Sequence, residues 1–375
     1  MKKVAHFIDS DDPGGAETLI IELAKISRAY DYQFEVFHFG NKWIESNCEK
    51  HNIDSIIVPY YNLYKSIMTL PFFMFMFIIF LKKRKIDILH SHLFDTLVAT
   101  TIPAYFSSTP HVGTLHDVYS IEDNTLRAYA LKFSTLLGTK IVTVSKQISD
   151  HLNSLCKFSY GDIKVIKNGV DMTKFSGTPL TDIRDELNLP KDSMLLVSVG
   201  RLVAVKGFDV LIKSIKKISD ATKKFNLIIV GDGPEMLKLK QLIKLESVEG
   251  YVKLIGHRDD VASILLQSDC FVLASKSEGL SCSIIEAMAT SLPIVATDVG
   301  GNNELVKNNE NGYLVPCDNV DELSNALINI ISNNTIRLTF ALCSKKIANR
   351  ELSIYKTLDA YINCYEEVSL SQSCY

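Results

Sequence analysis

The chain has 375 residues, of which 47% are hydrophobic and 22% are charged. A chain of this length exceeds what a single hydrophobic core normally supports, so two ordered globular domains are expected. Lysine and arginine number 40 against 43 acidic residues, and the formal net charge of −3 gives no electrostatic basis for a nucleic-acid partner.

The eight cysteines are scattered, without a Cys-x-x-Cys pair or a spacing typical of metal ligands. In a chain of this size we expect reduced, mostly buried thiols and a cytoplasmic location. Residues 4–8 are too short an apolar run for a signal peptide, and they predict the first strand instead.

A helical pattern begins near Ala16, and Gly14 and Gly15 lie between it and the first strand. A turn with two glycines lets the backbone approach a ligand closely. An ordinary loop from strand to helix explains the same residues equally well, so both interpretations stay open.

Residues 67–81 are apolar around the whole circumference of a helix, and the four basic residues 82–85 follow at once. This segment contains a proline and is shorter than the roughly 20 residues needed to span a bilayer. A buried crossover helix is one interpretation, although a helix packed on one side of a sheet usually keeps a polar stripe. We favour contact with the interface of an anionic membrane, which suits an apolar surface beside a basic cluster.

Residues 86–92 predict a strand that places His90 and His92 on one face. A metal pair is conceivable, but no third or fourth ligand accompanies these histidines in the sequence. We therefore expect no metal site and favour a structural or cleft-lining role. Residues 112–115 predict another strand, which puts His116 at its carboxyl end.

A second α/β series follows residues 173–190, which lack a strong period and include two prolines, as a linker would. Residues 194–200 predict the first buried strand of this series, and strands then alternate with helices. Arg201 and Lys206 come after that strand, at the edge where ligands of parallel sheets bind. Either residue alone would be interpreted as a surface charge.

Residues 271–274 and 293–297 predict two more strands, which flank a turn and a helix. Ser281 fits the N-cap of that helix, whose first-turn N–H groups suit a phosphate. Glu278 precedes the helix and Glu286 lies within it. Carboxylates in these places suit the hydroxyls of a sugar or a ribose. For Glu286 alone, a solvated helix residue is the simpler interpretation.

Glu278 and Glu286, with seven residues between them, match an E-x7-E signature, and the chain resembles the retaining glycosyltransferases of family 4. The resemblance continues in the family's order through residues 168–171, 200–209 and 231–234. It covers nearly the whole chain.

The resemblance implies the GT-B architecture, an α/β fold of two facing Rossmann-like domains with parallel sheets. We expect an acceptor-binding domain over residues 1–176 and a nucleotide-sugar-binding domain over residues 177–349. A helical tail over residues 350–375 would cross back and pack on the first domain.

The resemblance also assigns roles to single residues. Arg201 and Lys206 would hold the donor diphosphate, whose negative charge grows as it leaves the sugar. Glu278 would bind hydroxyls of the donor sugar, Glu286 those of the ribose, and His116 would contact the donor sugar. The other expected donor-binding residues are Gly14, Gly15, Gly279, Leu280 and Ser281. No metal and no cofactor are expected, because GT-B enzymes usually lack a metal site and the nucleotide sugar is a co-substrate.

These features predict a hexosyltransferase that uses a nucleotide sugar, a UDP-hexose or UDP-N-acetylhexosamine. The acceptor would be a saccharide, carried on a lipid, in surface polysaccharide biosynthesis at the inner face of the cell membrane. A sugar-nucleotide epimerase of the same fold should lack the E-x7-E unit. A Rossmann dehydrogenase needs a G-x-G-x-x-G loop, whereas here Pro234 follows Gly233 and the third glycine is missing. A non-catalytic nucleotide-sugar-binding subunit stays open as an alternative.

Overall fold

The structure is a computed structural model that describes residues 1–10, 14–117, 121, 124–159, 161–179, 181–222 and 224–372. It has two compact units, the first consisting of Met1–Gly169 with Ile354–Tyr375 and the second of Val170–Ser353. Val170 and Ser353 form a parallel bridge, so the chain enters and leaves the second unit at neighbouring points. These points lie a few residues from the expected boundaries at 176/177 and 349/350.

A parallel sheet forms the centre of the first unit, with the strand order β3-β2-β1-β4-β5-β6-β7. Its strands are β1 (Lys2–Ile8), β2 (Tyr32–His38), β3 (Asp54–Ile57), β4 (Ile88–His92), β5 (His111–Leu115), β6 (Lys140–Thr143) and β7 (Ile163–Val165). The direction of winding reverses between β1 and β4, as in Rossmann folds.

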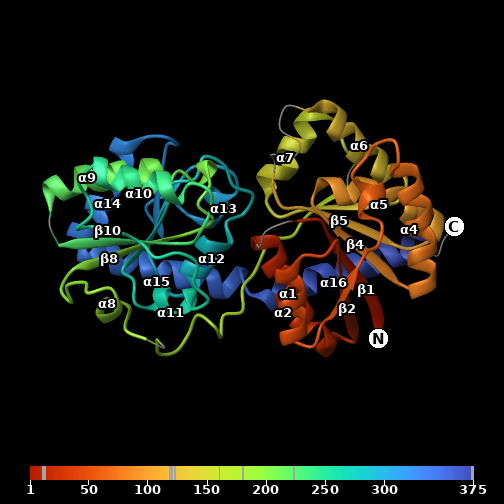
Figure 1. Cartoon of the computed structure of the whole chain (residues 1–375), viewed down its shortest axis with the longest axis horizontal. Coiled ribbons are helices and arrows are strands. Elements are labelled where there is room, and N and C mark those ends of the chain that lie inside the picture. The colour runs from red at the N-terminus through yellow and green to blue at the C-terminus, as the bar shows by residue number, and fades with distance from the viewer. Residues whose placement is uncertain are drawn as a thin grey trace. The chain divides into compact units, whose positions relative to one another are not determined.

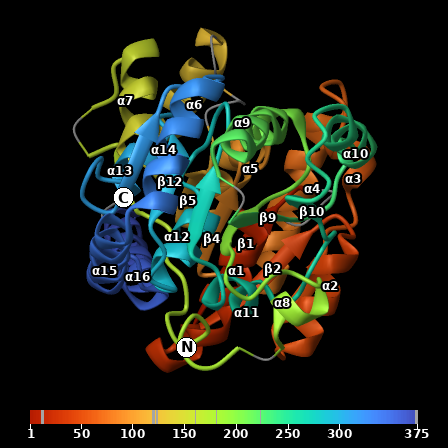
Figure 2. The same cartoon turned by 90° about the vertical axis from the view of Figure 1, so that its left-hand side faces the viewer.

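Helices cover both faces of this sheet (Figure 1 and Figure 2). They are α1 (Gly15–Ser27), the 3-10 turn η1 (Arg28–Tyr30), α2 (Lys42–Lys50), α3 (Tyr61–Tyr64), α4 (Leu70–Arg84), α5 (Phe94–Ser107), α6 (Thr125–Leu136), α7 (Lys146–Leu155) and α16 (Ile354–Gln372). The helices α1, α2 and α16 lie on one face, and α4, α5 and α6 lie on the other (Figure 1). The returning helix α16 places Leu358, Tyr361 and Tyr365 in the core beside α1.

The apolar segment at residues 67–81 supplies most of α4, which connects β3 to β4. Phe73, Phe77 and Leu81 recur every four residues and are buried in one core cluster with strand residues. The buried side of α4 therefore matches the interpretation of this segment as a crossover helix. Among the described helices, none is both long enough and apolar enough to cross a membrane.

The second unit has a parallel sheet with the order β10-β9-β8-β11-β12-β13. Its strands are β8 (Met194–Val199), β9 (Phe225–Val230), β10 (Val252–Leu254), β11 (Cys270–Leu273), β12 (Ile294–Thr297) and β13 (Gly312–Val315). Its helices are α8 (Ile183–Glu186), the 3-10 turn η2 (Ala204–Lys206), α9 (Phe208–Ala221), α10 (Met236–Leu245), α11 (Val261–Leu266), α12 (Cys282–Ala289), α13 (Asn302–Leu305), α14 (Val320–Ser332) and α15 (Asn334–Glu351).

In this unit α9, α10 and α14 lie on one face of the sheet, and α11, α12 and α15 lie on the other (Figure 1). The winding reverses between β8 and β11. Two parallel Rossmann-like sheets thus confirm the expected fold class. The cysteines within the described residues are free thiols, and four of them are buried.

Candidate functional site

Two of the expected donor-binding residues meet at one edge of the second sheet. Lys206 ends the short turn η2 after β8, and Glu278 lies in the loop between β11 and α12. Because β8 and β11 are the neighbours at which winding reverses, this edge is the usual ligand site of an open parallel sheet. The ammonium of Lys206 donates a hydrogen bond of 2.6 Å to Oε1 of Glu278. The fold therefore joins two side chains that are distant in sequence.

This ion pair is shielded from solvent. Glu278 is 8% exposed, and the side chain of Lys206 is 24% exposed. The hydroxyl of Ser275 donates a second hydrogen bond of 2.6 Å to the same carboxylate oxygen. The N–H of Lys276 donates to the carbonyl of Val205 at 2.7 Å, which ties the loop after β11 to the loop after β8. A shielded, charge-assisted bond between tied loops holds both side chains in place before a ligand binds.

A third loop, the one after β12, closes on Glu278. The N–H of Gly301 donates to the carbonyl of Gly279 at 2.8 Å. Gly300 has a φ of +54°, and a Cβ at this position would lie 1.7 Å from the carbonyl oxygen of Glu278. Only glycine combines this backbone conformation with so close an approach. Gly300 thus sets the distance between the two loops.

The helix α12 begins directly beyond Glu278. Ser281 is its N-cap and accepts a hydrogen bond of 3.4 Å from the N–H of Ile284. Gly279 and Leu280 form the turn before the cap, and Leu280 is buried. Glu286 lies in the middle of the helix and is half-buried, unlike a solvated helix residue. The first-turn N–H groups of α12 can receive a phosphate at the same edge.

Arg201 lies at this edge as well. It follows β8 directly, and its side chain is exposed. The next residue, Leu202, is buried, and its N–H donates to the carbonyl of Asp232 at 2.8 Å. The loop after β8 is thereby anchored to the loop after β9, which fixes the start of the segment that carries Arg201.

In the first unit, Gly14 and Gly15 stand at the start of α1, after β1 and beside the winding reversal of that sheet. Gly14 is the N-cap, and its N–H donates to the carboxylate of Glu17 at 2.8 Å. Its φ of −144° is open to any residue, so the turn does not require glycine for its conformation. Residues 11–13 of this loop lie outside the described part of the chain, and a ligand role for the two glycines stays a prediction.

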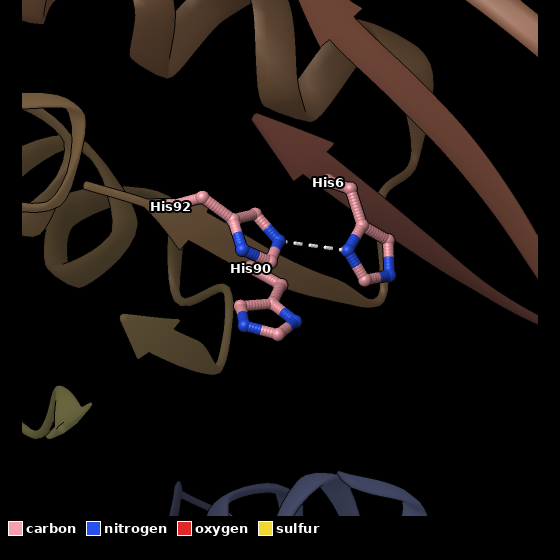
Figure 3. Close-up of side chains that lie close together, drawn as sticks. All are labelled: His6, His90 and His92. Atoms are coloured by element: carbon pink, nitrogen blue, oxygen red, sulfur yellow. Dashed lines mark hydrogen bonds between the residues drawn. The ribbon is translucent and has the colours of Figure 1, made fainter. Parts of the chain in front are cut away.

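His116 follows β5 and is half-buried. Its Nε2 lies 3.0 Å from Nδ1 of His92 at the end of β4. Burial lowers the pKa of His116 to about 4, so the imidazole is neutral near pH 7. In the sequence no third imidazole accompanies His90 and His92, but the sheet brings His6 beside them (Figure 3). Strand order is the signal that would have found it, because β1 pairs with β4 and His6 is opposite His90.

Comparisons with known proteins identify relatives of this chain. Residues 13–174 match the family model of glycosyltransferase family 4, and residues 181–346 match that of glycosyl transferases group 1. The UDP-Gal:alpha-D-GlcNAc-diphosphoundecaprenol alpha-1,3-galactosyltransferase of Escherichia coli is 31% identical over 304 residues, which are 78% of this chain and 78% of the relative.

Two solved structures share the fold. A glycosyltransferase from Rickettsia africae superposes with a TM-score of 0.87 at 21% identity, covering 98% of both chains. Anabaena HepE in complex with UDP-glucose superposes with a TM-score of 0.81 at 23% identity, covering 100% of both chains.

Proposed function

This chain is a glycosyltransferase of family 4, and we propose that it transfers a hexosyl unit from a UDP-sugar to a lipid-linked saccharide with retention of anomeric configuration. The Lys206–Glu278 pair at the winding reversal of the second sheet carries the donor half of this proposal. The names of the E. coli relative and of the HepE complex support UDP as the nucleotide, with a UDP-hexose or UDP-N-acetylhexosamine as donor. Family membership does not favour an epimerase or a non-catalytic subunit.

The ion pair offers both kinds of group that a nucleotide sugar requires. Lys206 and Glu278 neutralise each other in this pair. When the donor binds, the ammonium of Lys206 turns to a phosphate oxygen, and the carboxylate of Glu278 accepts a hydroxyl of the donor sugar. Arg201 adds a second cation for the diphosphate, and Glu286 accepts the ribose hydroxyls.

Transfer breaks the bond between the anomeric carbon and the phosphate oxygen, so negative charge grows on the departing diphosphate. The cations Lys206 and Arg201, once they contact the diphosphate, stabilise that charge and lower the barrier. The acceptor hydroxyl attacks from the side of the leaving group, and its proton passes to the departing phosphate oxygen. Retention then needs no protein nucleophile and, in this proposal, no metal. His116 contacts the donor sugar.

The acceptor half of the proposal rests on the outer face of α4. Phe72, Phe75 and Ile79 lie on this face and are 66%, 62% and 46% exposed. Lys82, Lys83 and Lys85 follow them at the end of the helix and are also exposed. Apolar side chains beside cations suit the interface of an anionic membrane, where a lipid-linked saccharide would be found.

The fourth basic residue of this run has another role. Arg84 donates a hydrogen bond of 3.2 Å to the buried carboxylate of Glu35, and its guanidinium lies 5.4 Å from the ring centre of Phe80. Lys3 donates a hydrogen bond of 3.4 Å to the other oxygen of this carboxylate, so Glu35 is held by two cations and Arg84 serves the fold. Three cations, rather than the four expected, are thus available for lipid.

Two further helices beside α4 also expose apolar side chains. Helix α4 packs against α5, and α5 packs against α6, on one face of the sheet (Figure 1). The end of α5 and the length of α6 also expose large apolar side chains, namely Tyr105, Phe106, Leu126, Tyr129, Phe133 and Leu136. A surface this wide can rest on a bilayer rather than receive a single peptide, and we propose peripheral contact with the inner face of the cell membrane in surface polysaccharide biosynthesis.

Vesicle sedimentation tests the acceptor half. Burying about 200 Å² of the outer face of α4 would contribute about 5 kcal/mol, and each exposed lysine adds about 1 kcal/mol near anionic lipid. Replacing Lys82, Lys83 and Lys85 with Gln should therefore weaken binding to phosphatidylglycerol vesicles by about 100-fold. Changing Phe72 and Phe75 to Ser should weaken binding as well.

The matched control replaces three exposed lysines of the second unit, Lys213, Lys240 and Lys244, with Gln, and it should bind vesicles like the wild type. High salt should partly release the wild type, because it screens the lysine contribution. If the wild type ignores anionic vesicles, the membrane-bound acceptor is wrong. Titration with UDP tests the donor half independently of that result.

A further inference from the structure

Three imidazoles form a hydrogen-bonded chain that ends at His116. Nε2 of His116 lies 3.0 Å from Nδ1 of His92, and Nε2 of His92 lies 3.0 Å from Nδ1 of His6. Figure 3 shows the second of these bonds, between β1 and β4. His6 lies on β1 and His92 on β4, and His116 directly follows β5, the next strand of the sheet. His6 and His92 are fully buried, so the chain runs from the interior of the sheet to its carboxyl edge.

A metal site is the alternative for this cluster, since one nitrogen each of His6, His90 and His92 lies within 4.8 Å of the others. The contacts of His90 argue against a metal site. Nδ1 of His90 lies 2.7 Å from the Tyr365 hydroxyl, and Nε2 lies 2.7 Å from the Thr114 hydroxyl. Its ring also stacks on His92 at 4.1 Å between centres. An imidazole binds metal through the lone pair in its ring plane, and stacked rings do not direct two such lone pairs at one ion.

The positions of the protons along the three imidazoles follow from the hydrogen-bonding state of the buried nitrogen at the His6 end. Burial lowers the pKa of His6 to about 3 and that of His92 well below its ordinary value, so both rings are neutral. A neutral imidazole has one donor and one acceptor, hence both N···N bonds must run in the same direction. Nε2 of His6 ends the chain, is buried, and has no partner among the described residues.

If the hydrogen bonds are donated from His116 towards His6, Nε2 of His6 carries an N–H without a partner. If they are donated from His6 towards His116, this nitrogen carries a lone pair instead. An orphaned buried N–H is the rarer defect in folded proteins. The proton of His6 therefore lies on Nδ1 and is donated to Nε2 of His92, and the proton of His92 lies on Nδ1 and is donated to Nε2 of His116. The remaining proton of His116 then lies on its Nδ1.

We propose that His92, supported by His6, is a positioning residue that holds His116 in the Nδ1–H tautomer and presents this N–H as a donor to a ligand oxygen. Within the described part of the chain, the hydrogen bond of His116 is made through Nε2, and Nδ1 has no side-chain or carbonyl partner. A hydroxyl of the donor sugar has the acceptor oxygen that such an N–H requires. The link to transfer rests on the proposed function, whereas the tautomer does not.

The tautomer can be read directly by NMR. Long-range ¹⁵N–¹H correlation spectra of protein labelled at its nine histidines distinguish protonated from unprotonated ring nitrogens. The His116→Gln spectrum assigns the signals of His116. In the wild type we expect a protonated Nδ1 and an unprotonated Nε2 at His116. A proton on Nε2 of His116 would overturn the proposal without any mutation that threatens folding.

Two substitutions of His92 separate positioning from packing. Asn places its amide at the level of Nδ1 and can still donate to His116, whereas Gln reaches to the level of Nε2 and cannot. We expect His92→Asn to keep the wild-type tautomer of His116, and His92→Gln to lose it and to lower kcat/KM by about tenfold, the worth of one hydrogen bond. His111→Asn is the matched control, because His111 is equally buried on β5 and bonds to Ser91 and Thr139 instead of the chain.

Each outcome bears on one claim. Equal loss of kcat/KM in all three variants would show that packing alone matters, and the positioning role would fail. Stabilisation of the wild type by Zn²⁺, abolished by His6→Asn, would replace the chain with a metal site. A wild type with the expected tautomer but without any transfer would leave the imidazole chain in place and remove the proposed function.

Discussion

Glu278→Gln should tighten the binding of UDP while it slows sugar transfer. The ammonium of Lys206 is bonded to the carboxylate of Glu278 at 2.6 Å. UDP has no sugar hydroxyls to occupy that carboxylate, so its diphosphate must compete with Glu278 for Lys206. The amide of Gln is neutral, competes less strongly, and no longer repels the diphosphate.

The size of the effect follows from the strength of the bond that UDP must replace. A hydrogen bond to a charged group contributes about 1.5–3 kcal/mol, and a neutral one about 1 kcal/mol. The substitution should therefore release about 1.4 kcal/mol of competition, which corresponds to about tenfold tighter binding of UDP. The carbonyl oxygen of Gln can still accept the hydrogen bond that Ser275 gives to Glu278, so the loop should keep its shape.

Calorimetric titration of UDP into wild type and variant measures this difference. Asp220→Asn is the control, because Asp220 forms an exposed ion pair with Lys216 on α9, and its removal should leave UDP binding unchanged. Transfer by Glu278→Gln should fall, since an amide is a weaker acceptor for the sugar hydroxyl. Unchanged or weaker UDP binding by Glu278→Gln would refute the idea that the pair opens for the diphosphate.

Three further substitutions test the same edge. Lys206→Ala should weaken UDP binding and lower turnover by about 10²-fold, through loss of leaving-group stabilisation, and equal turnover in a nucleotide-release assay would contradict it. Glu286→Gln should weaken free UDP and the UDP-sugar by the same factor, about tenfold, because the ribose is common to both; a loss confined to the UDP-sugar would move Glu286 to the sugar. Gly300→Ala should lower the free energy of unfolding in urea by about 1–3 kcal/mol, because its Cβ would meet the Glu278 carbonyl. Gly250→Ala, with open space around the Cβ, is its control, and equal stability of the two variants would contradict the close approach.

The fold class could be predicted because its signals are local. Buried apolar runs such as residues 194–200 predict strands by themselves, and their alternation with helices implies parallel sheets. The chain's crossings between units at Val170 and Ser353 have no such signal, because they depend on pairing of two segments distant in sequence. The expected boundaries at 176/177 and 349/350 therefore lie a few residues from these crossings.

The contacts of the site could be predicted only in part. Lys206 and Glu278 each carried a chemical role in the sequence, but their bond depends on β8 and β11 being neighbours across a reversal of winding. His6 gave no signal at all, since nothing local marks a histidine in an apolar strand. For Arg84 the local signal was misleading. The sequence places it in a basic run expected to face a membrane, whereas in the structure it pairs with the buried Glu35 of β2.

Helix α4 shows where periodicity stops being informative. Its residues are apolar on every side, so the sequence pattern does not show which of them are buried. In the structure Phe73 and Phe77 are buried, whereas Phe72 and Phe75 are exposed. Only packing against the sheet makes that distinction. The exposed stripe is the part that a membrane could cover.

Product analysis with a panel of donors is the most direct test of the central claim. The purified chain would be incubated with UDP-, GDP- and ADP-sugars and a lipid-linked saccharide in anionic vesicles, and the released nucleotide and the new linkage would be identified by NMR. We expect release of UDP only when the acceptor is present, an α-linked product from an α-configured donor, and a turnover about 10²-fold lower in Lys206→Ala. Preference for GDP- or ADP-sugars, or a β-linked product, would contradict the proposed reaction.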